Sequence, residues 1–382
     1  MQSGIQDKEA RVKKIKEEIT DSIYKRIIDK TSSPKNLNLN DFEYKARKIK
    51  LESTPEGVGI GTHYHCNARC VFCLGGNPQL FSLKRYQDFF EPRLGKIIQN
   101  ARYVSFCGFG ELLLMPDIEE FLSYVNNKLP DINKIYTTNG TPLLNEKVLS
   151  LLAGSRSSVE ISLHASNSQL HRRLMRTNNF EAVISQIRKL VAMRKDPSLP
   201  NISLVFLVNT LNIEDLPEFV RLAKDIGVNE VICNYMIMFK PAQLKLSCFF
   251  KQEITNESFS KAREIADKLQ IPLRLPPSFG EDLKQKDSFL CADPWKYFYV
   301  ENEGSVNPCC YAGYHFGYLD KTDFQTIWNG QNYRSLRQSL AQGPAHEWCR
   351  HCFRYDARNI NDIRSHISFR PGIAEEIIKS YK

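Results

Sequence analysis

Three cysteines, Cys66, Cys70 and Cys73, are separated by three and two residues in the run CNARCVFC at residues 66–73. Thiolates at this spacing can hold three irons of a four-iron cluster on one loop, which leaves the fourth iron without a protein ligand. Three other interpretations compete. Structural zinc wants four ligands, usually as two separated pairs. A disulfide framework is rare in reducing compartments, and no secretory signal is recognisable at the N-terminus. Free cysteines can also be ordinary buried residues.

This CxxxCxxC run resembles the signature of the radical S-adenosylmethionine (SAM) superfamily. The resemblance implies that the open iron binds the amine and carboxylate of the methionyl group of SAM. It also implies reductive cleavage of SAM to a 5′-deoxyadenosyl radical, which removes a hydrogen atom from a substrate. We therefore expect an enzyme. A non-catalytic iron–sulfur or zinc scaffold is the competing interpretation, and the open iron argues against it.

The elements that must position these thiols are predicted from alternating β-branched or apolar runs and helical patterns between residues 57 and 236, which is typical of βα units around a parallel sheet. We expect strands over residues 57–63, 102–107, 134–138, 159–163, 202–208 and 230–235. We expect helices over residues 86–100, 118–127, 146–152, 180–193, 216–226 and 258–269.

Six strand–helix pairs are too few for a closed eight-stranded barrel. The fold class expected is α/β, and the arrangement is similar to the partial (β/α)6 TIM-like barrel of the radical SAM family. Sites on parallel sheets lie at the C-terminal strand ends. We therefore expect the motifs at those strand ends to form the site.

The second strand ends in the run CGFGE at residues 107–111, which is similar to the GGE motif of the family. The resemblance implies that backbone carbonyls at Gly108 and Gly110 approach the ammonium group of SAM, since glycine permits close approach. It also implies that Glu111 supplies a carboxylate to the same cation. Phe109 stands where the family usually has its first glycine.

Three more residues match family positions for SAM contacts. Asn139 lies in a TNG-like turn after the third strand, Ser162 ends the fourth strand at the place of a ribose contact, and Arg176 corresponds to an arginine at the SAM carboxylate. An Asn-Gly turn, a polar strand end and an exposed helix arginine are the alternatives. His63 and His65 flank the cysteine loop, and we expect structural or supporting roles for them.

A second cysteine set lies in the C-terminal third. Cys291, Gly304 and Cys309 form a CX12GX4C run, and Cys349 and Cys352 form a CX2C pair. This pattern resembles the auxiliary-cluster region of SPASM/twitch proteins, and no further cysteine comes after it, as in the shortened twitch type. Four thiolates can ligate a second 4Fe-4S cluster fully. A zinc ribbon is the competing interpretation.

The net reaction depends on the fate of the substrate radical. Epimerisation needs a thiol that returns a hydrogen atom, and we expect Cys310 or Cys248 in that role because Cys310 adjoins a predicted ligand and Cys248 comes after the sixth strand. The expected substrate is a small molecule such as a sugar or aminoglycoside in natural-product biosynthesis. A dehydrogenase, or a maturase that oxidises or crosslinks a ribosomal peptide, is the alternative. The resemblance implies an electron donor such as flavodoxin or ferredoxin.

The 382 residues suffice for one large and one small domain, and 42% of them are hydrophobic. A net charge of +9 can favour an acidic or phosphate-bearing partner; it is spread along the chain, so no nucleic-acid partner is expected. No apolar run approaches a membrane span, so we expect a cytoplasmic protein without a membrane partner. The expected domains are a helical N-terminal extension (1–52), the barrel (53–275), the auxiliary-cluster domain (276–360) and a helical tail (361–382).

Overall fold

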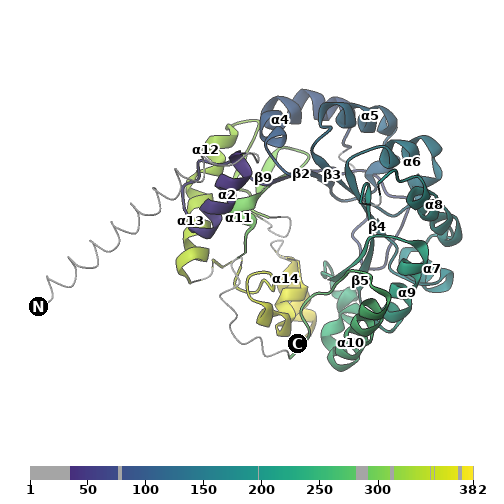
Figure 1. Ribbon diagram of the computed structural model, residues 1–382. Coiled ribbons are helices and arrows are strands. Elements are labelled where there is room, and N and C mark those ends of the chain that lie inside the picture. Colours follow the sequence, from purple (N-terminus) through teal and green to yellow (C-terminus); the bar gives the residue numbers. More distant parts are fainter. Residues whose placement is uncertain are drawn as a thin grey trace, which may run out of the picture.

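The computed structural model describes residues 35–75, 80–196, 198–280, 291–309, 314–344, 346–347, 349–368 and 372–381. Its strands form one strongly curved sheet, and helices cover the outer face of that curve (Figure 1). Within the described residues the strand order is β10-β9-β8-β1-β2-β3-β4-β5-β6-β7. The chain is therefore an α/β protein built as an open, partial barrel.

The parallel part of the sheet confirms the six strands expected from the sequence. They are β1 (Gly57–Gly61), β2 (Tyr103–Cys107), β3 (Asn133–Thr138), β4 (Ser157–Ser162), β5 (Asn201–Val208) and β6 (Glu230–Tyr235). A two-residue strand, β7 (Leu273–Arg274), extends this set at the edge of β6. All the C-terminal strand ends thus lie on one side, where the predicted motifs meet.

The expected helices are present on the outer face. They are α4 (Glu91–Gln99), α5 (Ile118–Lys128), α6 (Glu146–Ala153), α8 (Phe180–Ala192), α9 (Leu216–Ile226) and α10 (Gln252–Leu269). A short helix α3 (Leu83–Arg85) and a π-helical turn (Tyr86–Phe90) lead into α4. The helix α7 (Ser168–Met175) was not expected, and Asn167 caps it by accepting the N–H of Leu170.

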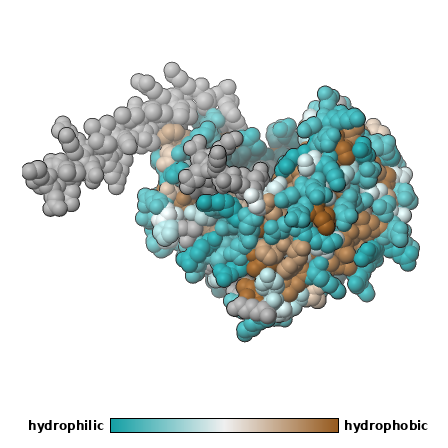
Figure 2. Space-filling view, turned by 90° about the horizontal axis from the view of Figure 1, so that it is seen from below, coloured by the Kyte–Doolittle hydropathy of each residue, from teal (hydrophilic) through white to brown (hydrophobic). Residues whose placement is uncertain are grey.

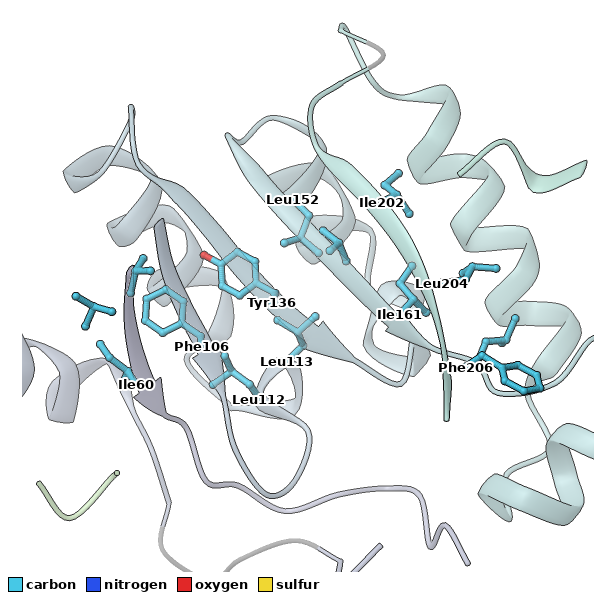
Figure 3. Close-up of a cluster of buried hydrophobic side chains, with 14 of the residues drawn as sticks. Ile60, Phe106, Leu112, Leu113, Tyr136, Leu152, Ile161, Ile202, Leu204 and Phe206 are labelled. Atoms are coloured by element: carbon cyan, nitrogen blue, oxygen red, sulfur yellow. The ribbon is translucent and has the colours of Figure 1, made fainter. Parts of the chain in front are cut away.

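The core lies between the strands and these helices. Alternate strand residues such as Phe106, Tyr136 and Ile161 are buried against the helices, as Figure 3 shows. The residues between them face the interior of the barrel. There Gly59 leaves room for aromatic rings, since a Cβ at Gly59 would lie 2.0 Å from the Tyr297 hydroxyl. The first strand is thus shaped to admit large side chains from its neighbour.

The C-terminal third continues the same sheet. Strand β8 (Tyr297–Val300) pairs in parallel with β1, β9 (Ser305–Asn307) pairs antiparallel with β8, and β10 (Gly317–Tyr318) pairs antiparallel with β9. Strands β8 and β9 therefore form a hairpin around Gly304. Helices α11 (Asp293–Lys296), α12 (Phe324–Trp328) and α13 (Gln331–Gln342) pack beside it. Because this part shares the barrel's sheet, the expected division after residue 275 stays a prediction.

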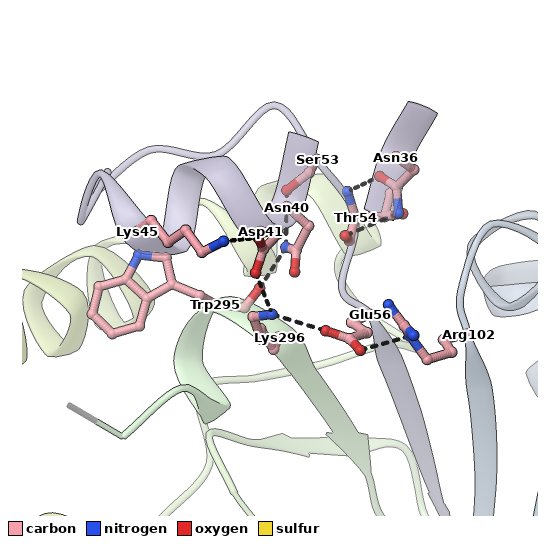
Figure 4. A network of polar contacts seen from close by, with 10 residues as sticks. All are labelled: Asn36, Asn40, Asp41, Lys45, Ser53, Thr54, Glu56, Arg102, Trp295 and Lys296. Atoms are coloured by element: carbon pink, nitrogen blue, oxygen red, sulfur yellow. Dashed lines mark hydrogen bonds and ion pairs between the residues drawn. The ribbon is translucent and has the colours of Figure 1, made fainter. Parts of the chain in front are cut away.

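The described part of the N-terminal extension contains helix α2 (Lys35–Lys45), whereas Ile15, Ile19, Ile23 and Ile27, which recur at helical spacing, lie outside the described residues. Figure 4 shows how α2 is fastened. Lys296 forms ion pairs with Asp41 of α2 and with Glu56 before β1, both at 3.0 Å. Asn40 donates to the carbonyl of Trp295 at 2.7 Å. The helix thus ties the start of β1 to the C-terminal third.

The expected helical tail, residues 361–382, stays a prediction as a domain, and its described part contains the helix α14 (Ile373–Tyr381). It lies at the open side of the curved sheet, near the C-terminal label in Figure 1. Just before it, the backbone of Met238 exchanges hydrogen bonds with His366 and Ser368 at 2.7 and 2.9 Å. Ile367 and Ile377 join a second apolar cluster with Phe72, Met175 and other residues. The end of the described chain therefore packs against the cysteine loop.

Polar side chains cover most of the face seen in Figure 2, and apolar ones gather in its middle part. Among the described residues, helices long and apolar enough to cross a membrane are not found.

Candidate active site

The CxxxCxxC loop comes after β1 and is held by backbone bonds to the end of α7. The N–H groups of Arg69 and Val71 donate to the carbonyls of Met175 and Leu174 at 3.1 and 3.0 Å. Phe72 is buried and packs edge-on against His164 after β4, with ring centroids 5.0 Å apart. Helix α7, which the sequence did not predict, is thus one of the supports of this loop.

All three thiols of this loop line one cavity of about 930 Å³. Amide N–H groups approach two of them, from Ala68 to Cys66 at 3.4 Å and from Gly75 to Cys73 at 3.3 Å. Burial raises the pKa of the Cys70 thiol to about 12, and Cys73 and Cys66 add to the shift. Neutral buried thiols become good ligands when cationic iron replaces their protons.

These observations fit a four-iron cluster. Three thiols share one cavity, and backbone N–H groups lie within hydrogen-bond distance of the sulfurs of Cys66 and Cys73. The cavity volume of about 930 Å³ leaves space for a further ligand on the open iron. The residues present would therefore hold the cluster on Cys66, Cys70 and Cys73.

The turn after β2 lies against the same loop. The N–H of Tyr64 donates to the carbonyl of Phe109 and the N–H of Glu111 to that of His65, both at 2.9 Å. Gly110 has φ of +120°, and a Cβ there would lie 1.9 Å from the Tyr64 carbonyl oxygen. Only glycine fits this position. Gly108 and Gly110 thus bring the backbone of the turn next to the root of the cysteine loop.

The Glu111 carboxylate points into the protein. It is 2% exposed and accepts the N–H of Asn139 at 2.6 Å and that of Leu113 at 3.3 Å. Burial raises its pKa to about 7. Both carboxylate oxygens are therefore engaged within the chain, which makes Glu111 a positioning residue for the turn after β3. A direct contact of this carboxylate with SAM, as expected from the resemblance, stays a prediction.

The side chain of Asn139 reaches the cysteine loop. Its Nδ2 donates to Asn67 Oδ1 at 2.7 Å and lies 3.9 Å from the sulfur of Cys66, and its Oδ1 accepts the N–H of Thr141 at 2.9 Å. The turn after β3 is thus joined both to Glu111 and to the first thiol.

Ser162 and Arg176 are placed differently. Arg176 ends α7 with φ of +57°, is exposed, and lines the cavity with the three thiols. Ser162 is the last residue of β4, is half-buried, and does not line that cavity. The SAM contacts of Gly108, Gly110, Asn139, Ser162 and Arg176 therefore stay predictions, and only Arg176 shares the thiol cavity.

The second cysteine set gathers around α11 and the turn at residues 349–352. An ion pair of 3.1 Å between Asp293 and Arg354 ties the two segments together. Burial raises the pKa of Cys291 to about 12, and Asp293 and Cys352 lie close enough to add to it. Burial likewise raises the pKa of Cys349 to about 12. Cys291 and Cys349 thus each lie close to Cys352, and ligation of a cluster by these cysteines stays a prediction.

The fourth predicted ligand, Cys309, comes after β9 and lies close enough to Tyr333 of α13 to affect its pKa. Cys291 comes before β8 and Cys309 comes after β9, so two of the four predicted ligands flank one hairpin. The assignment of Cys309 itself stays a prediction.

Of the two cysteines expected as hydrogen donors, only Cys248 lies within the described residues. Cys248 is 2% exposed in a 3-10 turn (Cys248–Phe250), belongs to the main apolar core, and lies near Tyr235. This packing position argues against a role as donor, because the sulfur is enclosed by apolar core residues. Cys310 lies outside the described residues. Cys233 is 3% exposed and belongs to the main apolar core.

A thiol that was not among the expected hydrogen donors faces the barrel interior. Cys107 ends β2 opposite Gly61, with Val104 and Phe106 of the same strand buried on the helix side. Its sulfur accepts a contact from the Ser105 hydroxyl at 3.3 Å. Burial raises its pKa to about 11, and Glu301 and Glu160 lie close enough to add to the shift.

Polar residues continue around this inner wall. Glu160 of β4 accepts from Thr137 of β3 at 3.3 Å, and Glu230 of β6 pairs with Arg274 of β7 at 2.8 Å. Glu301 comes after β8 with a side chain 14% exposed. Sequence alone could not find this row, since strand register decides which residues share a level. The alternation of Glu160 with apolar Val159 and Ile161 was its one visible signal.

Two family models match this chain. One, the Radical SAM superfamily, covers residues 60–223, and the other, an iron–sulfur cluster-binding domain named SPASM, covers residues 291–353. The first contains Cys66, Cys70 and Cys73. The second runs from Cys291 past Cys352. The two predicted thiol sets thus fall within two separate matches, and the matched auxiliary region is of the SPASM kind; the narrower twitch assignment stays a prediction.

In sequence, the chain is 30% identical over 159 residues to a probable GTP 3′,8-cyclase of Methanocaldococcus jannaschii, which covers 41% of this chain and 50% of that protein. It is 24% identical over 263 residues to a GTP 3′,8-cyclase of Clostridium botulinum, covering 65% and 78%. The chain thus spans about half the length of the archaeal relative.

In structure, it is similar to Streptococcus suis SuiB bound to S-adenosylmethionine, with a TM-score of 0.62 and 17% identity over 84% of this chain and 78% of that one. Native anSMEcpe with bound AdoMet gives 0.57 and 15% over 85% and 95%. At these identities the likeness shows a shared fold.

Proposed function

Since this chain belongs to the radical SAM superfamily and carries a SPASM-type iron–sulfur domain, we propose that it takes a hydrogen atom from a C–H bond of a small polar molecule held inside the barrel. Its cofactors are SAM, a SAM-binding 4Fe-4S cluster and auxiliary iron–sulfur. When bound, SAM and the open iron supply a 5′-deoxyadenosyl radical, which becomes 5′-deoxyadenosine on taking the hydrogen.

One observation carries the choice of substrate: the inner wall of the barrel is polar and acidic. Glu160 and Glu301 flank Cys107, and Glu230 lies further along the wall with Arg274. Carboxylates accept hydrogen bonds from hydroxyl and ammonium groups, and they repel phosphate. A sugar or aminoglycoside therefore fits this wall better than a nucleotide does, so we do not transfer the cyclase activity of the relatives.

The proposed net reaction is epimerisation at the carbon that loses hydrogen. A thiol on the opposite face would return a hydrogen atom to carbon, and the sulfur radical left behind would need one electron and one proton. Cys107 is the cysteine among the described residues that faces the barrel interior at a strand end. Cys310, next to Cys309, is one of the two donors expected from sequence. Electron supply to the spent sulfur is a chemistry that the auxiliary cluster offers.

Oxidation is the second candidate, because Cys291, Cys309, Cys349 and Cys352 can saturate an auxiliary cluster, which then has no open iron and is suited to exchanging electrons. In that case the substrate loses two hydrogens. The same chemistry on a peptide would make the protein a maturase. The acidic inner wall favours the smaller substrate.

The basic test uses anaerobically reconstituted protein with a chemical reductant. Wild type should form 5′-deoxyadenosine and methionine from SAM, and the Cys66→Ala/Cys70→Ala/Cys73→Ala variant should form none. Zinc in place of iron in protein purified without air, or cleavage by the triple variant, would overturn the proposal.

The substrate is then sought as a compound that stimulates 5′-deoxyadenosine formation, comparing aminoglycosides with sugar phosphates, nucleotides and peptides. In deuterium oxide, epimerisation adds one deuterium to carbon, whereas oxidation lowers the product mass by two hydrogens. Cys107→Ser should still allow hydrogen abstraction but stall turnover, because an O–H bond is too strong to yield its hydrogen to a carbon radical. Normal turnover by Cys107→Ser would remove this residue as donor.

A further inference from the structure

The cavity that holds the three thiols has a rim of five cations. Arg69 comes from the cysteine loop, Arg173 and Arg176 from the end of α7, and Lys240 and Lys245 from the segment after β6. All five side chains are exposed. Among the described residues that line this cavity there is no Asp or Glu.

These cations also lack partners elsewhere. Within the described parts of the chain, none of the five forms an ion pair with a carboxylate. Surface cations of this protein are often paired, as Arg188 is with Asp225 and Lys84 is with Asp88. A group of unpaired charges of one sign concentrates a positive potential at the mouth of the cavity and draws anionic partners to it.

The substrate proposed above is not the obvious partner of this rim. None of Cys107, Glu160, Glu230 and Glu301 lines the cavity, and their wall carries the opposite charge. An anionic substrate would leave the rim for a wall that repels it. The rim is therefore suited to an anionic partner that stays outside the barrel and needs access to the cluster.

We propose that this rim is the docking surface for a small acidic redox protein, such as a flavodoxin, that delivers the electron for SAM cleavage. The inference rests on the proposed function. Exposed charges of this kind raise the association rate and orient the partner, while adding little affinity, which suits a transient electron-transfer encounter. The half-buried thiols at the base of the cavity place the cluster next to the docked protein.

Helix α14 supports this surface by packing beside it. It packs on the segment Pro241–Leu246 that carries Lys245, through the apolar cluster of Ile377 and Leu246. The Gln243 side chain of that segment donates to the Val71 carbonyl of the cysteine loop at 3.3 Å. The lysines are thus fixed relative to the thiols, as a docking surface requires.

The overall step balances with the partner named by class. One electron leaves the flavin hydroquinone of the donor, the bond between sulfur and C5′ of SAM breaks, and methionine and the 5′-deoxyadenosyl group are formed. The donor is left as the semiquinone after one turnover.

The test compares two reductants on reconstituted protein. A purified bacterial flavodoxin, kept reduced by its reductase and NADPH, is the acidic probe, and dithionite-reduced methyl viologen is a cationic one that needs no docking site. The variant Arg173→Glu/Lys240→Glu/Lys245→Glu leaves Arg176 and the cysteine loop intact. Its control, Arg172→Glu/Lys224→Glu/Lys268→Glu, makes the same charge change at exposed residues that do not line the cavity.

With flavodoxin at low salt, the rim variant should form 5′-deoxyadenosine at least about tenfold more slowly than wild type and control. With methyl viologen, all three should match. Raising the ionic strength from about 0.01 M to about 0.15 M shortens the screening length from about 30 to 8 Å, and it should slow wild type towards the rim variant. An unchanged flavodoxin rate in the rim variant would overturn the proposal. An equal loss with both reductants would also overturn it, because the cations would then serve SAM or the substrate.

A second readout does not depend on activity. Carbodiimide joins touching lysines and carboxylates, so mixtures with flavodoxin should give crosslinks at Lys240 and Lys245, and these should fade with salt. Crosslinks confined to lysines elsewhere would contradict the docking site. If the triple variant does not fold, the same comparison is made with Lys240→Gln/Lys245→Gln, which removes two charges without reversing them. A protein that fails to cleave SAM even with methyl viologen refutes the proposed function, while the crosslinks still judge the surface.

Discussion

The imidazole Nε2 of His63 lies 2.9 Å from a carboxylate oxygen of Glu301. The other ring nitrogen, Nδ1, accepts the N–H of Phe109 at 3.1 Å. His63 therefore joins the end of β1, the glycine turn after β2 and the residue directly after β8. The expectation of a structural role for this histidine agrees with that position.

His63→Ala should lower the free energy of unfolding by about 1–3 kcal/mol, because it leaves the Glu301 carboxylate and the Phe109 N–H without their buried partner. Urea unfolding of the cluster-free protein measures this loss. His65→Ala removes an exposed imidazole from the same loop and should cost far less. Equal losses for the two variants would show that the His63 contacts add nothing to stability.

Glu111 should make stability depend on pH. Burial raises its pKa from 4.5 to about 7, so between these values the folded state keeps a proton that the unfolded state has lost. The contribution of this group to stability therefore falls as pH rises through that window. Relative to Glu111→Gln, wild type should lose roughly 3 kcal/mol between pH 4.5 and 7.5. Parallel pH profiles of unfolding for the two proteins would refute the buried titration.

Cys291→Ala should separate the two thiol sets. The iron content should fall from about eight to about four per chain, since one 4Fe-4S cluster is lost. SAM cleavage with a chemical reductant should persist, because Cys66, Cys70 and Cys73 are untouched. Iron analysis and a 5′-deoxyadenosine assay on the same sample check both points. Loss of cleavage together with the auxiliary iron would mean that the first site depends on the second.

Ile377→Ala should loosen the cysteine loop from the far end of the chain. Ile377 is fully buried in the apolar cluster that contains Phe72, and its truncation costs about 2–5 kcal/mol of packing. We expect the first cluster to bleach faster in air than in wild type, while the auxiliary one keeps its rate. Lys379→Ala, on the same helix, is the control. Bleaching at wild-type rates would show that α14 does not support the loop.

The strands and most helices were predictable because each carries its signal locally. Strand β6 begins and ends at the predicted residues, 230 and 235, since its apolar residues alternate between clear breaks. Helix α7 escaped prediction because the run SQLHRRLM spans only eight residues and carries only three apolar ones, Leu170, Leu174 and Met175.

The site was predictable only where one loop holds it. The thiols of Cys66, Cys70 and Cys73 lie within eight residues, so their spacing sufficed. The inner-wall placement of Cys107 depends on register with β1 and β8, and the packing of Ile377 on the cysteine loop joins residues some three hundred positions apart. No local pattern encodes such contacts, so Cys107 was not among the expected hydrogen donors, and the bond from Asn139 to Glu111 was not predicted.

The parallel pairing of β8 with β1 has a mechanical meaning. Gly57, Val58, Gly59 and Ile60 are in register with Tyr297, Phe298, Tyr299 and Val300. The loop that carries the first thiol set begins directly after β1, and the hairpin leading to Cys309 begins directly after β8. The chain thus reaches Cys66 and Cys309 from two strands that are hydrogen-bonded neighbours in one sheet. Clusters held at the two predicted thiol sets would therefore keep a spacing that is set when the sheet forms, and electron exchange between them would need no movement of one strand relative to the other.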